Sequence, residues 1–266
     1  MAKPRKTKKI MLPEEPPLSR RPRAVVVGAS SGIGAALARR LAAEGYVVAV
    51  LARRKPKLDE LCAEINAQAD VTSALPYPHD VTELEAIPAL FQRLLKDLGG
   101  IDVFVYCTGV TIPVAIDEFN LEKDRRMIET NLLGAIAWLG RAAALFQRLG
   151  AGHLVGISSV AGDRGRVLNP AYNSSKAGLD TYLEALRNRL TRHGVHVLTV
   201  KPGFVATEQL KGSPRTFGVI SSERAAAGVW AALHGRKQLV YVPWYWRWIM
   251  LAVRLTPSFI FRRLSF

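Results

Sequence analysis

The stretch AVVVGASSGIG at residues 24 to 34 most constrains how this chain of 266 residues folds. Its β-branched run predicts a strand, its glycines predict a tight loop, and the alanine-rich AALARRLAAEG has helical periodicity. We expect Gly28 to allow the turn, Gly32 to let the backbone approach a pyrophosphate, and Gly34 to permit close helix packing. Free N–H groups at the helix start would hold the phosphates. Glycine clusters also occur in flexible turns, but the strand and the helix around this one favour a dinucleotide site.

Strand-like runs alternate with helix-length segments along the rest of the chain. The runs fall at residues 24–27, 46–51, 101–106, 153–157, 195–200 and 238–242. This alternation, in a chain that is 49% hydrophobic, predicts an α/β fold: one Rossmann-type domain with a doubly wound parallel sheet flanked by helices. We expect this domain over residues 23–243, a disordered basic arm over 1–22 and an amphipathic tail over 244–266.

A tyrosine and a lysine suggest a catalytic site. Tyr172 and Lys176 lie at positions i and i+4 of a predicted helix, in AYNSSKAG, and therefore share one face. Ser159, which ends the upstream strand-like run in LVGISSVAG, could complete the group. A lysine cation favours the phenolate of a neighbouring tyrosine, which makes that side chain a usable proton donor and acceptor. A helical Tyr and Lys also face one another by chance.

Together these motifs resemble the short-chain dehydrogenase/reductase family over about residues 22 to 242. The family's T-G-x-x-x-G-x-G pattern matches residues 27–34, with Val27 replacing the threonine, and P-G-x-x-x-T matches residues 202–207. The resemblance implies a catalytic set made of Asn131, Ser159, Tyr172 and Lys176. In that set Tyr172 gives a proton to a substrate oxygen that Ser159 holds. Lys176 binds the nicotinamide ribose, and Asn131 positions a water that relays protons to the lysine.

The resemblance also implies where a dinucleotide is bound. The residues are Gly28, Ser30, Ser31, Gly32, Ile33, Gly34, Arg53, Arg54, Asp80, Val81, Gly109, Tyr172, Lys176, Pro202, Gly203, Val205 and Thr207. One segment departs from the family: Tyr106, Cys107, Thr108 and Gly109 stand where N-N-A-G is usual. Gly109 keeps the close approach to the cofactor. The asparagine contacts that stiffen the central strands need a replacement that the sequence does not identify.

The end of the second strand indicates which cofactor is used. Its sequence VAVLARRK has Ala52 where NAD-binding relatives carry an acid, and Arg53 comes directly after. Because arginine attracts a 2′-phosphate through charge-assisted contacts, we expect NADP(H). Arg54 either assists or is a solvated cap of the next helix. Asp80 either contacts the adenine amino group or caps the helix that begins at TELEAIPAL.

Cysteine and histidine usage argues for a reducing compartment and against a metal. Cys62 and Cys107 are isolated, and no apolar signal peptide opens the chain, so a cytoplasmic location is expected. His193 and His196 lie at a predicted helix-to-strand junction without further ligands nearby in the sequence. We therefore expect turn and strand roles for them and no metal site.

The chain has a net charge of +15, and its first 23 residues are rich in Lys, Arg and Pro. Glu14 and Glu15 are the only acids of this arm. Such a segment cannot bury enough apolar surface to fold alone. It could contact an anionic membrane surface or nothing. Nucleic acid is not expected as a partner, because no aromatic side chains are interleaved with the charges.

Residues 244–266 include Trp244, Trp246 and Trp248, and Arg247 and Arg254 interrupt any run long enough to span a bilayer. The arginines and Ser258 follow helical spacing and leave a broad apolar face, made of Trp248, Met250, Leu251, Val253 and Leu255. Such a helix either lies in a membrane interface or packs over the substrate lobe or at a subunit interface.

Within the family, the tail resembles polyprenylphosphoryl keto-pentose (decaprenylphosphoryl-2-keto-erythro-pentose) reductases, through R-x-x-M-x-x-x-R-x-x-P-x-x-x-F-R-[KR]-L at residues 247–264. Three functions stay open. They are NADPH-dependent reduction of a lipid-linked or apolar carbonyl at the inner face of a membrane, a reductase or dehydrogenase activity on a soluble substrate such as an oxoacyl thioester or steroid-like alcohol, and an idle scaffold that binds cofactor or nucleic acid. The resemblance implies a homodimer or homotetramer.

Overall fold

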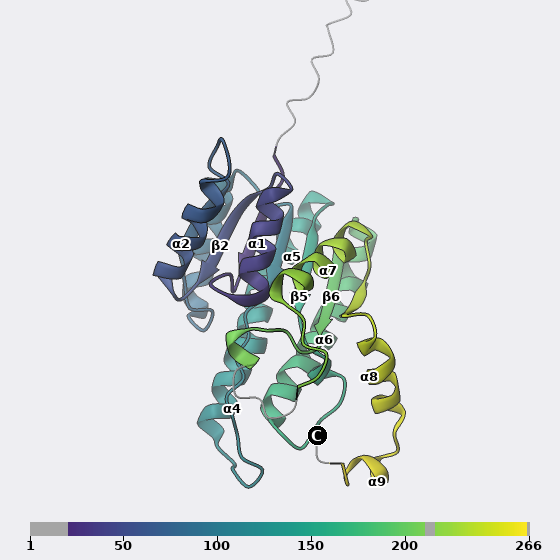
Figure 1. Cartoon of the computed structure of the whole chain (residues 1–266). Coiled ribbons are helices and arrows are strands. Elements are labelled where there is room, and N and C mark those ends of the chain that lie inside the picture. The colour runs from purple at the N-terminus through teal and green to yellow at the C-terminus, as the bar shows by residue number, and fades with distance from the viewer. Residues whose placement is uncertain (1–20, 211–215, 265–266) are drawn as a thin grey trace, which may run out of the picture.

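The computed structural model describes residues 21–210 and 216–264, and these form one parallel sheet with helices on both faces (Figure 1). The strand order is β3-β2-β1-β4-β5-β6-β7. The strands are β1 Arg23–Val27, β2 Val47–Ala52, β3 Ala74–Pro78, β4 Val103–Tyr106, β5 His153–Ile157, β6 His196–Pro202 and β7 Leu239–Val242. This architecture confirms the predicted doubly wound α/β fold. The expected arm over residues 1–22 lies almost wholly outside the described residues.

The helices alternate with the strands. They are α1 Gly32–Ala43, α2 Lys55–Asn66, α3 Ile87–Leu98, α4 Leu121–Ile128, α5 Gly134–Leu149, α6 Pro170–Leu190, α7 Ser222–His234, α8 Trp246–Leu255 and α9 Ser258–Phe261. Each strand-like run found in the sequence overlaps a strand of the sheet. Strand β3 was not among those runs. Its sequence ALPYP carries two prolines, which a sheet tolerates because β3 is an edge strand.

The central strand β1 separates two hydrophobic layers. Ala24 and Val26 belong to a cluster with α1, α2 and α7, whereas Val25 and Val27 belong to a cluster with α3, α5 and α6. All four side chains are fully buried. Because β1 is covered on both faces, its side chains are buried on both, and its sequence after Arg23 is a continuous apolar run.

The turn after β1 places the start of α1 against the sheet. Gly28 has a φ of +94°, a conformation that side chains disfavour. A Cβ at Gly34 would lie 2.2 Å from the carbonyl oxygen of Gly28, so only glycine fits at this contact. The predicted roles of both glycines in turn formation and close packing are confirmed.

Two histidines form a pair at the start of neighbouring strands. His196 Nε2 lies 2.8 Å from the carbonyl oxygen of Lys237, which can only accept, so Nε2 carries the proton. Nδ1 of His196 then accepts a hydrogen bond from Nδ1 of His153, 3.1 Å away. Burial lowers the pKa of both imidazoles, that of His153 to about 4. The expected strand role of His196 is confirmed.

Candidate active site

A pocket of about 1270 Å³ lies where the strand order changes direction, between β1 and β4. The crevice at such a switch point is where open α/β sheets bind ligands. Loops that follow β1, β2, β4, β5 and β6 line this pocket. Of the site residues predicted from the sequence, all line it except Asn131.

The glycine-rich loop faces a second loop across this pocket. A Cβ at Gly32 would lie 2.9 Å from Cγ2 of Thr207, and a Cβ at Gly109 would lie 3.2 Å from Nζ of Lys176. The bare backbone at both glycines thus lets Thr207 and Lys176 approach closely, and the glycine-rich loop leads into the N-terminus of α1. These features fit a dinucleotide with its pyrophosphate at a helix N-terminus.

Arg54 links the two sides of the pocket. Its Nη2 donates to the hydroxyls of Ser30 and Ser31, at 2.9 and 2.8 Å, and its Nη1 donates to Glu208 Oε2 at 2.6 Å. Its side chain makes no capping hydrogen bond to α2. Arg54 is the exposed N-cap residue of α2, as one of its two predicted roles has it, and its guanidinium also lies beside the glycine-rich loop.

Asp80 pairs with the arginine expected to select the cofactor. Its Oδ2 lies 3.5 Å from Nη1 of Arg53, and its Oδ1 accepts hydrogen bonds from the backbone and hydroxyl of Thr82. Burial would raise the pKa of Asp80, but the bonds from Thr82 and the charge of Arg53 outweigh burial and lower it. Helix α3 begins only at Ile87, so Asp80 closes a turn and does not cap that helix, contrary to one of its two predicted roles.

Ser159, Tyr172 and Lys176 meet at one wall of the pocket. Nζ of Lys176, which is almost fully buried, lies 5.9 Å from the centroid of the Tyr172 ring and donates to the carbonyl oxygen of Ile157 at 3.1 Å. Ser159 follows β5, and its Oγ accepts a hydrogen bond from the backbone of Ala161. Its hydroxyl proton is then available to a ligand oxygen. Helix α6 thus projects the phenol and the ammonium together, as its i, i+4 spacing predicts.

Asn131 lies behind the pocket. It sits in a π-helical turn, Glu129–Leu133, and is fully buried. Its Oδ1 accepts from the backbone N–H of Val110, and its Nδ2 donates to the carbonyl oxygen of Val110 and to Ser175 Oγ. The side chain therefore fixes the loop after β4 against α6. The water-positioning role remains a prediction, and this amide is already engaged within the protein.

The structure shows what replaces the family's asparagines after the fourth strand. Tyr106 is fully buried, and its hydroxyl donates to the carbonyl oxygen of Thr130 at 2.6 Å. Gly134 makes room for it, because a Cβ there would lie 2.8 Å from the Tyr106 hydroxyl. At the next position, burial raises the pKa of the Cys107 thiol to about 12. Tyr106 thus ties β4 to the turn that carries Asn131.

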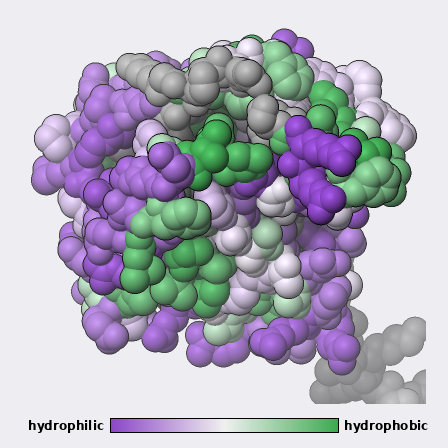
Figure 2. All heavy atoms as spheres, turned by 90° about the horizontal axis from the view of Figure 1, so that it is seen from below, coloured by the Kyte–Doolittle hydropathy of each residue, from purple (hydrophilic) through white to green (hydrophobic). Residues whose placement is uncertain are grey.

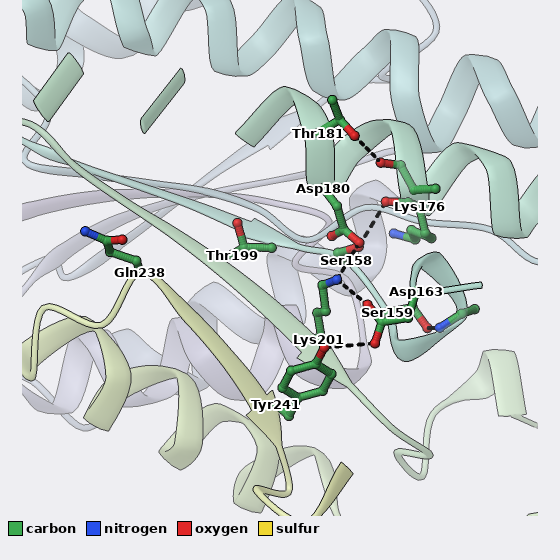
Figure 3. Close-up of polar contacts among 12 residues, drawn as sticks. Ser158, Ser159, Asp163, Lys176, Asp180, Thr181, Thr199, Lys201, Gln238 and Tyr241 are labelled. Carbon is green, nitrogen blue, oxygen red and sulfur yellow. Dashed lines mark hydrogen bonds and ion pairs between the residues drawn. The ribbon is translucent and has the colours of Figure 1, made fainter. Parts of the chain in front are cut away.

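A buried charged cluster lies behind Ser159 and Lys176 (Figure 3). Lys201 Nζ contacts Asp163 Oδ1 and lies 2.8 Å from Asp180 Oδ2, while the Tyr241 hydroxyl donates to Asp163 Oδ2. The side chains of Lys201 and Asp163 are 8% and 2% exposed. Burial opposes the charge of Lys201, but the two carboxylates outweigh burial and raise its pKa; burial raises the pKa of Asp180. The cluster joins β6 and β7 to α6 and to the segment after Ser159.

The tail forms one wall of the pocket. The sequence had left open whether the tail packs on the protein or lies in a membrane interface. Trp246 and Met250 of α8 are buried and line the pocket. A Cβ at Gly203 would lie 1.9 Å from Nε1 of Trp246, so that glycine makes room for the indole. Phe204 and Phe217 lie 5.6 and 5.0 Å from the Trp246 ring, centroid to centroid. The expected packing over the substrate lobe is therefore present.

The single apolar face expected for the tail is divided. Met250 and Val253 line the pocket, whereas Trp248, Leu251 and Leu255 are exposed on the outer side of α8. Arg164, which follows Ser159 in the chain, donates to the carbonyl oxygens of Val253 and Thr256 and lies over the ring of Phe261. The tail is thereby fastened to the segment that carries the candidate serine.

Comparisons with known proteins identify the family. The model of the family described as short chain dehydrogenase matches residues 22–216. An uncharacterized oxidoreductase of Mycobacterium tuberculosis is 34% identical over 236 residues, which is 88% of this chain and 92% of that relative. A ketoacyl reductase of Nostoc is 29% identical over 223 residues, which is 82% of this chain and 77% of that relative.

Solved structures agree. A short-chain type dehydrogenase/reductase from Mycobacterium marinum has a TM-score of 0.75 at 26% identity and covers 83% of this chain and 93% of its own. An actinorhodin polyketide ketoreductase with NADPH has a TM-score of 0.76 at 26% identity and covers 84% of this chain and 95% of its own. The chain belongs to the short-chain dehydrogenase family and is an oxidoreductase of that class.

Proposed function

We propose that this oxidoreductase is an NADPH-dependent carbonyl reductase, acting in reverse as an alcohol dehydrogenase. The observation that carries the proposal is the meeting of Ser159, Tyr172 and Lys176 in the same pocket as the glycine-rich loop and Arg53. A scaffold that only binds a nucleotide needs neither the buried lysine nor the serine beside it. NADPH consumption with a panel of ketones tests the proposal, and failure to oxidise NADPH with any of them would refute it.

Each residue of the Ser159, Tyr172 and Lys176 group has its own role in the proposed reduction. Ser159 donates a hydrogen bond to the substrate oxygen and holds it near the Tyr172 hydroxyl, which gives it a proton. Lys176 favours the phenolate that remains and binds the nicotinamide ribose. Bound NADPH supplies the hydride for the carbonyl carbon. The glycine-rich loop, Asp80, Val81, Val205 and Thr207 line the pocket, and the proposal assigns the dinucleotide to them.

We predict that NADPH is preferred to NADH because of Arg53. Its guanidinium is half-exposed and lies 3.5 Å from Asp80, its one ion-pair partner among the described residues, so it can turn toward a 2′-phosphate. The Arg53→Ala variant should bind NADPH roughly ten- to a hundredfold more weakly, the loss expected for one charge-assisted contact, and bind NADH about as before. Fluorescence titration with both nucleotides measures this. Arg93→Ala, on the exposed side of α3, is the matched control. Equal weakening of both nucleotides by Arg53→Ala would contradict the prediction.

The substrate that fits this pocket is apolar next to its carbonyl group. The wall made by Phe204, Phe217, Trp246, Ile249 and Met250 supports this proposal. The tail pattern at residues 247–264 suggests a polyprenylphosphoryl keto sugar as the candidate. A soluble ketone is the second candidate, because relatives of this chain include a ketoacyl reductase and a polyketide ketoreductase.

We further propose that the enzyme is cytoplasmic, acts as a homodimer or homotetramer, and meets the inner face of the membrane through its tail and basic arm. None of the described helices is long and apolar enough to cross a membrane. Figure 2, which views the side where α4, α8 and α9 lie in Figure 1, shows broad hydrophobic areas beside hydrophilic ones. The exposed apolar side chains of the tail are Trp244, Trp248, Leu251, Leu255, Phe259, Ile260 and Leu264.

Charge favours an anionic bilayer over a second copy as the occupant of this face. Residues 244–266 contain Arg247, Arg254, Arg262 and Arg263 and no acidic residue. Two copies joined through the tail would oppose arginines to arginines, whereas anionic headgroups attract them by roughly 1 kcal/mol each. An apolar stripe with tryptophan and flanking arginines is typical of helices that lie in a membrane interface.

We predict that the full chain binds vesicles of phosphatidylcholine with phosphatidylglycerol, more weakly as salt rises. Replacing Trp248 and Leu255 together by serine removes two exposed apolar side chains and should weaken sedimentation with these vesicles at least about tenfold. This variant leaves the buried Trp246 in place, which truncation of the tail would not. Leu149→Ser, at the exposed end of α5, is the control. Absence of binding at low salt, or an equal effect of the control, would contradict the prediction.

A further inference from the structure

Arg166 is a partly buried cation that the proposed chemistry does not use. It lies between Ser159 and Tyr172 in the chain and lines the pocket. Its Nε and Nη2 atoms are buried, and neither has a hydrogen-bond partner among the described residues. Two donors on one edge of a guanidinium match the two oxygens of a carboxylate or a phosphodiester.

Nearby acids do not satisfy this guanidinium. Burial lowers the pKa of Arg166, while Tyr172 and Asp163 act in the opposite direction. Both carboxylate oxygens of Asp163 are already engaged, one by Lys201 and the other by Tyr241. Arginine nevertheless keeps its charge in proteins, so these two donors of a charged group remain without a partner in the part of the chain that the structure describes. Buried donors of a charged group that lack partners are costly, and an anion that enters the pocket would offset the cost.

The phosphates of the dinucleotide have other places. The pyrophosphate fits the glycine-rich loop opposite Thr207, and the 2′-phosphate fits beside Arg53 and Arg54, which lie on the β1–β2 side of the pocket. Arg166 lies in the segment between β5 and α6 with Ser159 and Tyr172, where the carbonyl substrate reacts. Its ligand is therefore a group of the substrate.

We propose that Arg166 is a specificity-determining residue that binds an anionic group, a carboxylate or phosphodiester, on the substrate while the aromatic wall holds an apolar part. The inference rests on the proposed function and narrows its substrates to amphiphilic anions. A phosphodiester of this kind occurs in lipid-linked sugars and in phosphopantetheine-linked thioesters. Arg166 binds the charged group of either kind of substrate. The apolar wall discriminates between the two kinds by the length of their hydrocarbon chains.

Binding is tested without turnover. Diethyl phosphate and dioctyl phosphate are titrated by calorimetry into the full chain, with and without NADP⁺. The Arg166→Gln variant should bind both phosphates about ten- to a hundredfold more weakly, as expected for loss of a bidentate charged contact, and Arg166→Lys should recover part of the loss. Arg192→Gln, on the exposed turn before β6, makes the same charge change away from the pocket and should bind as the parent does. Tighter binding of dioctyl phosphate than of diethyl phosphate indicates that the natural substrate is lipid-linked. Equal binding of the two phosphates indicates a soluble substrate.

Kinetics supply the second readout. A keto acid and its neutral methyl ester form a matched pair, and Arg166→Gln should raise KM for the acid about ten- to a hundredfold while KM for the ester stays within about twofold. Equal effects on acid and ester, or phosphate binding that ignores residue 166, would overturn the inference. If no ketone is reduced but phosphate binding depends on Arg166, the proposed function fails and the anion site stands. NADP⁺ binding by each variant shows that it is folded, and Arg166→Lys decides the matter if Arg166→Gln does not fold.

Discussion

Tyr172→Phe is expected to lower kcat by about 10²- to 10⁴-fold, the contribution typical of general acid catalysis. The substitution removes only the hydroxyl that donates the proton and leaves the ring 5.9 Å from Nζ of Lys176. NADPH affinity should change little, because Lys176 and the glycine-rich loop are untouched. Steady-state turnover of a ketone, with nucleotide titration beside it, measures both quantities.

Tyr182→Phe is the matched control on the same helix. The Tyr182 hydroxyl donates to the carbonyl oxygen of Ile136 at 3.3 Å and lies outside the pocket lining. Its removal should leave kcat within about twofold, since an exposed neutral hydrogen bond contributes little to a distant site. A Tyr172→Phe enzyme that kept more than about a tenth of the parent kcat would show that another group supplies the proton.

Lys201→Met is expected to lower the free energy of unfolding by about 3–5 kcal/mol, as breaking a buried ion pair does when one partner stays behind. The variant leaves Asp163 and Asp180 without their shared cation. Urea unfolding measures the loss. Lys57→Met is the control, because Lys57 is half-exposed and lies 3.9 Å from Glu208.

The loss should depend on pH in a defined direction. Burial already raises the pKa of Asp180, and removal of Lys201 raises it further because no cation remains. A group with a raised folded-state pKa binds more protons when folded, so acidification stabilises the folded variant. The difference in free energy of unfolding between the Lys201→Met variant and the parent should therefore be larger at pH 8 than at pH 5. A difference that does not change with pH, or a loss of unfolding free energy below about 1 kcal/mol, would show that water solvates the two carboxylates in place of Lys201.

The sequence predicted those parts of the site in which chemistry dictates residue type. Gly28 and Gly34 meet backbone geometry that other residues cannot, and Ser159, Tyr172 and Lys176 supply functional groups that few other residues provide. Such requirements leave a local pattern with fixed spacing. The fold followed from alternating strand and helix periods, apart from β3, whose prolines suppress the strand signal.

Other features depend on tertiary packing and left no local pattern. Tyr106 replaces an asparagine through a contact with Thr130 that exists only once β4 and the π-helical turn are adjacent. The outer and inner faces of α8 are both apolar, so periodicity could not tell which residues would line the pocket. Arg166 lies in a polar segment whose sequence has no distinctive pattern. Only the folded structure shows that its Nε and Nη2 atoms lack hydrogen-bond partners among the described residues.

Helix α8 follows the seven strands of the described sheet, yet it closes the side of the pocket where we propose that the substrate binds. The loops proposed to bind the nucleotide and the Ser159–Tyr172–Lys176 group all precede this helix in the chain. Substrate choice can thus diverge among descendants of one ancestral gene through exchange of a terminal helix, while the sheet stays unaltered. Two contacts limit which helices are interchangeable: the close fit of Trp246 against Gly203, and the carbonyl groups that Arg164 holds.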